Sequence, residues 1–142
     1  GIQHRDFKSL NVLLDDYLHC KVSDFGLSKS RTTMQTTSHA LGNANERAMA
    51  TLAWTAPERL KIGSRFTDKC DVYSFGVTLY EIASRSLPFE GEEALVIRMS
   101  ILEGARPEIP DDAPEAFAAL ICECWAQEAR LRPGFEEITR RL

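Results

Sequence analysis

The stretch that most constrains this fold is residues 68–84, which read DKCDVYSFGVTLYEIAS. A helix of this length would carry apolar side chains in nearly every direction: Cys70, Val72, Tyr73, Phe75, Val77, Leu79, Tyr80, Ile82 and Ala83. Such a helix is either buried in a protein core or spans a membrane. The stretch is at the lower length limit for a bilayer and contains Asp71 and Glu81, which argues against a membrane span. We therefore predict a helix through the middle of a globular core, about 25 Å long at roughly 1.5 Å per residue.

Asp71 is the unusual member of this helix, because a buried carboxylate needs hydrogen-bond donors. Thr67 is placed to cap the helix, and Asp68 and Asp71 fall in its first turn, where the helix dipole favours negative charge. We expect the donors for Asp71 to be backbone N–H groups of a neighbouring loop. That loop is predicted to carry the chemistry of the protein.

The composition is that of a soluble globular domain. The chain has 142 residues, a net charge of −4 and 44% hydrophobic residues, which is enough for one domain with a real core. Its mild acidity gives no support for binding to nucleic acid or to an anionic membrane, and no signal peptide or transmembrane run is visible. The cysteines lack the spacing of a metal site, so we expect buried free thiols in a reducing, cytoplasmic compartment: Cys20, Cys70, Cys122 and Cys124.

Two short apolar runs, at residues 12–14 and 18–23, are separated by a pair of aspartates. This pattern predicts a small β-hairpin. Because the two ends of a hairpin lie side by side, Asn11 before it and Asp24 after it should come together at one edge. An amide oxygen and a carboxylate there are ligands that suit Mg²⁺.

Three short motifs follow one another in a characteristic order: HRDFKSLN at residues 4–11, DFG at 24–26 and APE at 56–58. Each motif alone is weak, since a lone DFG is usually a turn and a lone HRD a solvated polar patch. Together, their order and spacing resemble the protein-kinase signature from the catalytic loop onward. Residues 71–82 resemble the central helix of the kinase C-terminal lobe. The later motifs GARPEIP, CW and RPGF are similar to those of tyrosine kinases and tyrosine-kinase-like serine/threonine kinases, and HRDFKSLN most resembles the latter group.

The resemblance covers essentially the whole chain and implies a mainly α fold, the C-lobe of a protein kinase with a small β-hairpin. It implies ATP-dependent phosphoryl transfer to serine or threonine of a protein substrate. Asp6 would accept or orient the proton of the substrate hydroxyl, and Lys8, which accompanies serine/threonine specificity, would neutralise the γ-phosphate. Thr51 matches a threonine that contacts these two residues and shapes the substrate-docking loop.

The same resemblance implies ATP and Mg²⁺ as cofactors. Asp24 would chelate Mg²⁺ between the phosphates, and Asn11 would hold a second Mg²⁺. Leu13 would lie under the adenine ring. Lys8 would complete the contacts to the nucleotide through its ammonium group.

Two buried structural contacts are also implied. His4 would pack against Phe25 and be tied to Asp71, with no part in proton transfer. Glu58 would form an ion pair with Arg132, and removing one partner of such a buried pair costs about 3–5 kcal/mol.

Residues 24–58 are expected to be the activation segment of a partial kinase domain that spans residues 1–142. Arg5 would face this segment and bind an anion. The anion would be the fixed carboxylate of Glu46 or, as we favour, a phosphate on the cluster Thr36, Thr37 and Ser38. A third reading is that Glu46 is simply solvated.

Helical spacing of apolar residues predicts three further helices within residues 92–103, 113–126 and 135–142. Arg85 departs from the family pattern, because it stands where a glycine commonly ends the central helix. A non-glycine residue with positive φ is costly there but possible.

The motifs of the N-terminal kinase lobe, which are a Gly-rich loop, a strand lysine and a helix glutamate, do not occur in these residues. We therefore expect the chain to be a piece of a larger kinase. Alone it should be inactive, because ATP would meet only one wall of its cleft. The alternative is a pseudokinase or truncated lobe that only binds other proteins. The presence of Asp6, Asn11 and Asp24 favours an active parent enzyme.

Overall fold

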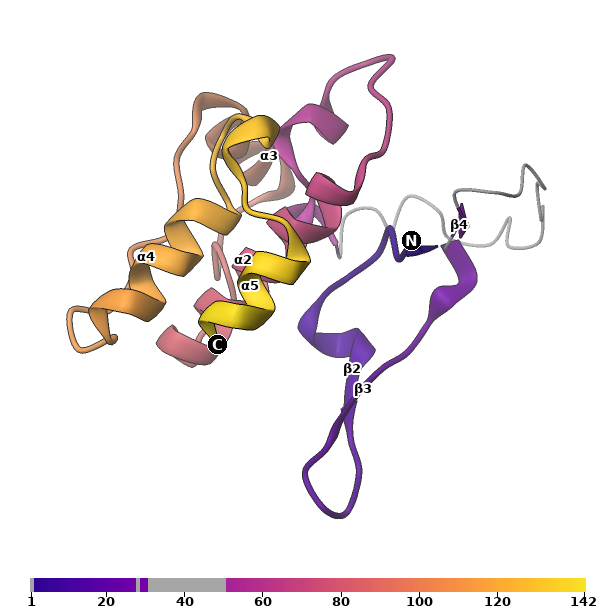
Figure 1. Ribbon diagram of the computed structural model, residues 1–142. Helices are drawn as coiled ribbons and strands as arrows, with labels where there is room; N and C mark the ends of the chain where they lie inside the picture. The colour runs from indigo at the N-terminus through magenta and orange to yellow at the C-terminus, as the bar shows by residue number, and fades with distance from the viewer. Residues whose placement is uncertain (1, 28, 31–50) are drawn as a thin grey trace.

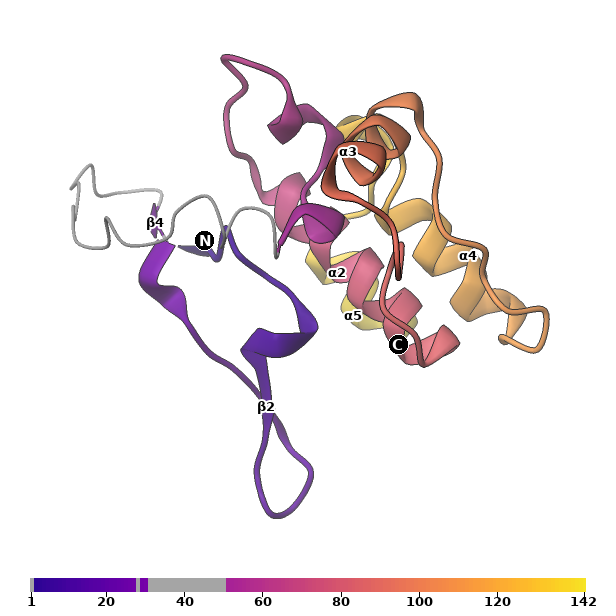
Figure 2. The ribbon, with the colours of Figure 1, turned by 180° about the vertical axis from the view of Figure 1, so that it is seen from behind.

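The computed structural model describes residues 2–27, 29–30 and 51–142. The described part is mainly helical, with the helices gathered on one side and a hairpin projecting on the other (Figure 1). Figure 2 shows the same arrangement from behind. The helices are α2 (Asp68–Ser84), α3 (Ala94–Glu103), α4 (Glu115–Cys124) and α5 (Phe135–Arg141). This architecture confirms the predicted mainly α fold, and none of the helices just named is long and apolar enough to cross a membrane.

Helix α2 is buried from Cys70 to Tyr80 except at the half-buried Phe75, as its all-round apolar pattern predicts. Tyr73 is 0% exposed. The prediction is wrong only for the last turn, where Ile82 is 63% exposed and reaches solvent. Gly76 allows α4 to approach α2 closely, because a Cβ atom at this position would lie 2.7 Å from the Cβ atom of Cys124.

The other three helices lie inside their predicted ranges and each buries one face. Helix α4 packs on α2 and buries Leu120 and Ile121. Helix α3 buries Ile101, and α5 buries Ile138. The predicted ranges were slightly too long because loop residues such as Pro114, the N-cap of α4, flank the apolar repeat.

Both ends of α2 are set by particular residues. Thr67 takes the extended backbone of an N-cap, and its N–H donates to Cys70 Sγ at 3.5 Å. At the other end Arg85 has a φ of 56°, and its N–H donates to the Glu81 carbonyl at 2.8 Å. Arg85 thus takes the positive φ that commonly calls for glycine at the end of this helix, although glycine adopts this conformation at lower cost.

The predicted hairpin is confirmed, with β2 (Val12–Leu14) antiparallel to β3 (Cys20–Val22). Its register pairs Val12 with Val22, Leu13 with Lys21 and Leu14 with Cys20. A second antiparallel pair, β1 (Ile2–Gln3) with β4 (Lys29–Ser30), was not predicted. Strands of two residues leave no alternation in the sequence from which they could be recognised.

All four cysteines are free, but only Cys70 and Cys124 are buried. The prediction of burial is wrong for Cys122, which lies two positions before Cys124 on α4 and therefore points to the solvent side of that helix. It is also wrong for Cys20, which lies on the hairpin, where described residues leave it exposed. Burial raises the pKa of the Cys124 thiol to about 12, so this side chain is an uncharged part of the core.

The predicted ion pair between Glu58 and Arg132 is confirmed. Arg132 Nη1 and Nη2 donate to the two carboxylate oxygens of Glu58 at 2.7 and 2.8 Å. The Arg132 side chain is fully buried, and further donors bind the carbonyls of Lys69 and Ala126 at 2.8 and 2.9 Å. Every charged end of this pair is therefore matched, which is the condition for a buried ion pair to be tolerated.

A buried carboxylate, that of Asp71, ties the N-terminal loop to α2. Its Oδ2 accepts the N–H of His4 and its Oδ1 accepts the N–H of Arg5, both at 2.9 Å. Burial raises the pKa of Asp71, and the two N–H donors oppose that change by stabilising the charged form. The expectation that loop N–H groups satisfy Asp71 is confirmed, and it identifies the loop as residues 4–11.

We predict that Arg132→Met in the full-length protein lowers the free energy of unfolding by about 3–5 kcal/mol, because Glu58 is left without its cationic partner. Chemical denaturation measures the loss. Arg141→Met is the matched control, since Arg141 forms a similar two-oxygen pair with Glu123 in a more exposed position. The control should lose much less stability.

The acid dependence of stability checks the same contact. Burial opposes the ionisation of Glu58 and is the largest single influence. The hydrogen bonds and positive charge of Arg132, together with a backbone N–H and the Cys70 thiol, outweigh it and lower the pKa of Glu58. A lowered pKa in the folded state adds stability above the ordinary pKa of the carboxyl group, and this stability is lost as the pH falls through the folded pKa. Glu58→Gln should therefore flatten the loss of stability on acidification. An unchanged acid dependence, together with a small effect of Arg132→Met, would contradict the prediction.

We further predict that Asp71→Asn makes the amide protons of residues 4 and 5 exchange faster by about 10–100-fold, because an amide side chain has one acceptor oxygen where the carboxylate has two. Hydrogen exchange monitored by mass spectrometry of the full-length protein measures this. Asp68→Asn in the same helical turn is the control, since Asp68 is exposed. Equal exchange in both variants would mean that Asp71 does not hold the loop.

Candidate active site

His4 anchors the start of the loop at residues 4–11. The side chain is 6% exposed, and its Nε2 lies 2.8 Å from the carbonyl oxygen of Ser23. The N–H of Asp6 donates to His4 Nδ1 at 3.3 Å, which makes Nε2 the protonated nitrogen. The ring also contacts Phe25 at 4.8 Å between centroids. The expected packing of His4 is confirmed, and with both nitrogens engaged it acts as a structural link.

Three of the predicted substrate-side residues meet in one cluster. Lys8 Nζ donates to Thr51 Oγ1 at 2.9 Å and lies 3.4 Å from Asp6 Oδ2. Asn11 Nδ2 donates to the Asp6 carbonyl at 2.7 Å and lies 3.4 Å from Asp6 Oδ2. These bonds hold one edge of the Asp6 carboxylate, while its Oδ1 accepts no hydrogen bond from the described residues. Oδ1 is therefore the carboxylate oxygen that this cluster leaves without a hydrogen bond.

The predicted metal ligands lie at the open end of the hairpin. The Asn11 carbonyl accepts from Ser23 N–H at 2.8 Å and from Ser23 Oγ at 3.1 Å, so Asp24 follows directly beside Asn11. Asp24 is exposed with a φ of 56°, and its Oδ1 accepts the Gly26 N–H at 3.4 Å. No hydrogen bond joins the Asn11 and Asp24 side chains among those of the described residues.

The donor set at this end fits Mg²⁺, because amide and carboxylate oxygens are the hard ligands that this ion prefers. Asn11 Nδ2 donates to the Asp6 carbonyl, and the Asn11 side-chain oxygen accepts no hydrogen bond from the described residues. Among the described residues no group of three or more His, Cys, Asp or Glu side chains is arranged to hold a metal ion. Leu13, predicted to contact adenine, is 54% exposed on β2 and is accessible to a ligand.

Arg5 is less exposed than a free surface arginine. Its Nη2 donates to Gln3 Oε1 at 2.9 Å, and its guanidinium lies 5.2 Å from the centre of the Phe66 ring. Its φ of 73° places it in the left-handed region, and the bonds to Asp71 hold this strained backbone in place. The anions predicted for Arg5 lie outside the described residues: Thr36, Thr37, Ser38 and Glu46.

Glu81 is the residue of this region that sequence reasoning missed. Its Oε1 accepts the Ser9 hydroxyl at 2.7 Å, and its Oε2 accepts the Trp54 indole N–H at 2.9 Å. The signal that could have identified it is the same as for Asp71: a carboxylate within an otherwise apolar helix. The kinase motifs gave no role to Glu81 or to its two partners, Ser9 and Trp54.

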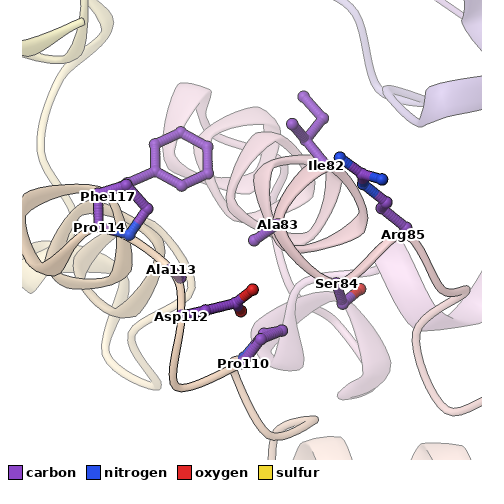
Figure 3. Close-up of a pocket in the computed structure, with 9 residues that line it drawn as sticks. All are labelled: Ile82, Ala83, Ser84, Arg85, Pro110, Asp112, Ala113, Pro114 and Phe117. Carbon is purple, nitrogen blue, oxygen red and sulfur yellow. The ribbon is translucent and has the colours of Figure 1, made fainter.

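A surface hollow of about 610 Å³ lies at the C-terminal end of α2 (Figure 3). The side chains of Ala83, Asp112 and Phe117 border the open space in Figure 3. The lining comes from the end of α2 and the segment that leads into α4: Ile82, Ala83, Ser84, Arg85, Pro110, Asp112, Ala113, Pro114 and Phe117. None of the predicted site residues is among them.

Known proteins resemble this chain along its whole length. A serine/threonine-protein kinase/receptor of Acanthamoeba polyphaga mimivirus is 37% identical over 141 residues, which cover 99% of this chain and 8% of that protein. A serine/threonine-protein kinase of Dictyostelium discoideum is 36% identical over 143 residues, which cover 100% of this chain and 15% of that protein. A LIM domain-containing serine/threonine-protein kinase of the same organism is 38% identical over 142 residues, which cover 100% of this chain and 20% of that protein. The chain thus spans a fifth or less of the length of these relatives.

The family comparison agrees with the geometry. The family model described as protein tyrosine and serine/threonine kinase matches residues 1–142. The loop tied to α2, the cluster of Asp6 with Lys8 and Thr51, and the oxygen groups at the end of the hairpin all lie within that match. The chain belongs to the protein tyrosine and serine/threonine kinase family.

Proposed function

We propose that the protein containing this chain transfers the γ-phosphoryl group of ATP to a serine or threonine hydroxyl of a protein substrate. The observation that carries the proposal is the bridge made by Lys8, whose Nζ contacts both Asp6 Oδ2 and Thr51 Oγ1. It joins a carboxylate, a cation and the segment that leads into the APE motif. Phosphoryl transfer needs such positioned charges and little covalent chemistry from the protein.

In the proposed reaction the substrate oxygen bonds to the γ-phosphorus as the bond from that phosphorus to the bridging oxygen breaks, and ADP leaves. Asp6 Oδ1 accepts the hydroxyl proton, while Oδ2 stays oriented by Lys8 and Asn11. Lys8 lies beside the transferred group and balances its negative charge. Thr51 fixes the direction of the Lys8 side chain.

We assign the nucleotide side to the hairpin. Leu13 offers an exposed apolar side chain to the adenine ring. Asn11 and Asp24 would hold Mg²⁺, which spreads the charge of the phosphates when it is bound. This assignment rests on the matching motif positions and on the placement of both residues at one end of the hairpin.

We propose serine/threonine specificity and a kinase domain in which residues 24–58 form the activation segment. Its support is Lys8 in the HRDFKSLN motif and the names of the relatives, which are serine/threonine-protein kinases. We also propose a cytoplasmic location, because ATP is available there and all four cysteines are free. Finding the native protein with its cysteines in disulfides outside the cytoplasm would contradict that location.

A pure binding module is the second candidate, and one observation favours it for the isolated chain. The hairpin exposes large apolar side chains, such as Leu14 with 61% of its surface exposed and Val22 with 44%. They form an apolar surface on which a partner protein can bind. The organised cluster around Asp6 favours the enzyme, since a binding role alone needs no such arrangement.

We predict that Asp6→Asn in the full-length protein lowers kcat by about 10²–10⁴-fold, because the general base is lost while the fold is kept. Transfer of labelled phosphate from ATP to a protein substrate measures this, and analysis of the labelled amino acids should give phosphoserine or phosphothreonine. Asp16→Asn is the control, an exposed aspartate in the hairpin turn. Label on tyrosine alone would overturn the specificity, and full activity of Asp6→Asn would overturn the role of Asp6.

The isolated 142 residues are predicted to transfer no phosphate, while the full-length protein does. The sequence contains no Gly-rich loop or strand lysine to cover and orient the phosphates of ATP. We also expect the isolated chain to aggregate through its exposed apolar hairpin, which light scattering would detect. Transfer by the purified chain that is abolished by Asp6→Asn would contradict this prediction.

A further inference from the structure

The loop at residues 4–9 runs along α2 and is tied to it at both ends. Asp71 binds the N–H groups of His4 and Arg5, and Glu81 binds the hydroxyl of Ser9. Asp71 and Glu81 are ten residues apart, which is about 15 Å along a helix. The loop between these two attachments is bent at Arg5, which has a φ of 73°. A loop held in this way has little freedom to move its central residues.

Glu81 also binds a second segment, because its other oxygen accepts the indole N–H of Trp54. Trp54 is 7% exposed, and its carbonyl accepts the Ser74 hydroxyl of α2 at 2.8 Å. Both its side chain and its backbone are therefore fixed to the same helix. Trp54 lies three residues after Thr51, and the N–H of Trp54 donates to the Thr51 carbonyl at 3.1 Å.

The partners of Glu81 flank the Lys8–Thr51 contact on both sides. Ser9 directly follows Lys8, and Trp54 closes a turn that begins at Thr51. A single carboxylate thus fixes two segments that are separated by more than forty residues of chain, at the place where their side chains must meet.

We propose that Glu81 is a positioning residue for phosphoryl transfer, which sets the contact of Lys8 with Thr51 beside Asp6 by accepting hydrogen bonds from Ser9 and Trp54. The inference rests on the proposed function and extends it to a residue outside the kinase motifs. Glu81 does not touch the reacting atoms itself and acts through the two segments that it joins.

A rival role for a carboxylate near a substrate site is to bind a basic side chain of the substrate. The contacts of Glu81 argue against it, because each of its oxygens already accepts a hydrogen bond and the side chain is only partly exposed. Burial raises the pKa of Glu81, and the Ser9 and Trp54 donors oppose that change. These donors are neutral, which suits a group whose task is to hold position.

The test uses the full-length protein and the variants Glu81→Met, Ser9→Ala and Trp54→Phe, singly and combined. Met keeps the length of the side chain but removes both acceptors. We expect Glu81→Met to lower kcat for a serine- or threonine-containing peptide by about 10–100-fold, the factor that corresponds to hydrogen bonds to a charged group. The KM for ATP should not change, because neither partner of Glu81 lies on the nucleotide side.

The combined variants show whether Glu81 is the link. In the presence of Glu81, Ser9→Ala and Trp54→Phe should each lower kcat. In the Glu81→Met background the same two substitutions should have little further effect, since their shared partner is gone. If each lowers kcat by the same factor in both backgrounds, the positioning role is overturned.

A variant could lose activity simply because part of the protein is unfolded. The number of sites that bind nucleotide is therefore measured for each variant, and kcat is expressed per nucleotide-binding site. Thr78→Val is the matched control, because its buried hydroxyl donates only within α2, to the Ser74 carbonyl at 3.1 Å. It should lower the melting temperature and leave kcat per site unchanged.

Two further results would overturn the role: a normal kcat per site in Glu81→Met, or a loss confined to peptides with Lys or Arg near the acceptor. If the unmodified protein transfers no phosphate, the proposed function fails and this role with it, whereas an active protein with a normal Glu81→Met variant removes this role alone.

Discussion

The structure depends first on the carboxylate of Asp71, which lies in the first turn of a buried helix and accepts two N–H groups from a loop more than sixty residues earlier. A carboxylate in such a place is costly unless donors surround it. Because of that cost, the carboxylate of Asp71 selects one arrangement of the loop: only a loop whose N–H groups point towards α2 supplies the donors that it needs. Arg5 adopts a φ of 73° where it presents its N–H, and this strained residue directly precedes Asp6.

The remaining geometry follows from having one rigid helix beneath two separate segments. Lys8 and Thr51 are distant in sequence, and their contact would close a long loop at a large entropic cost if it stood alone. Helix α2 reduces that cost because it holds both segments independently, one through Asp71 and the other through the Ser74 hydroxyl. Glu81 is the point where the two attachments meet on one side chain.

Sequence reasoning succeeded where one strong constraint decides the outcome. The all-round apolar pattern of α2 required burial, and the buried Asp71 required donors, so the central helix and its loop could be predicted. The exposed Cys122 shows the limit, because residue type suggests burial while helical phase decides it. Glu81 shows another limit: its partners Ser9 and Trp54 come together only through tertiary packing, which no local spacing records.

The two sides of the candidate site differ in how completely the described residues build them. On the acceptor side Lys8 has a side-chain exposure of 12% and Asp6 of 18%, and both have fixed partners. On the proposed nucleotide side Asp24 and Leu13 are exposed, and the Asp24 carboxylate has only a 3.4 Å contact with the Gly26 N–H among the described residues. Preorganised charges lower the barrier of a reaction only where they need not move. The side chains of the proposed acceptor side are therefore already fixed by this chain, and we propose that the nucleotide side is completed by other parts of the full-length protein.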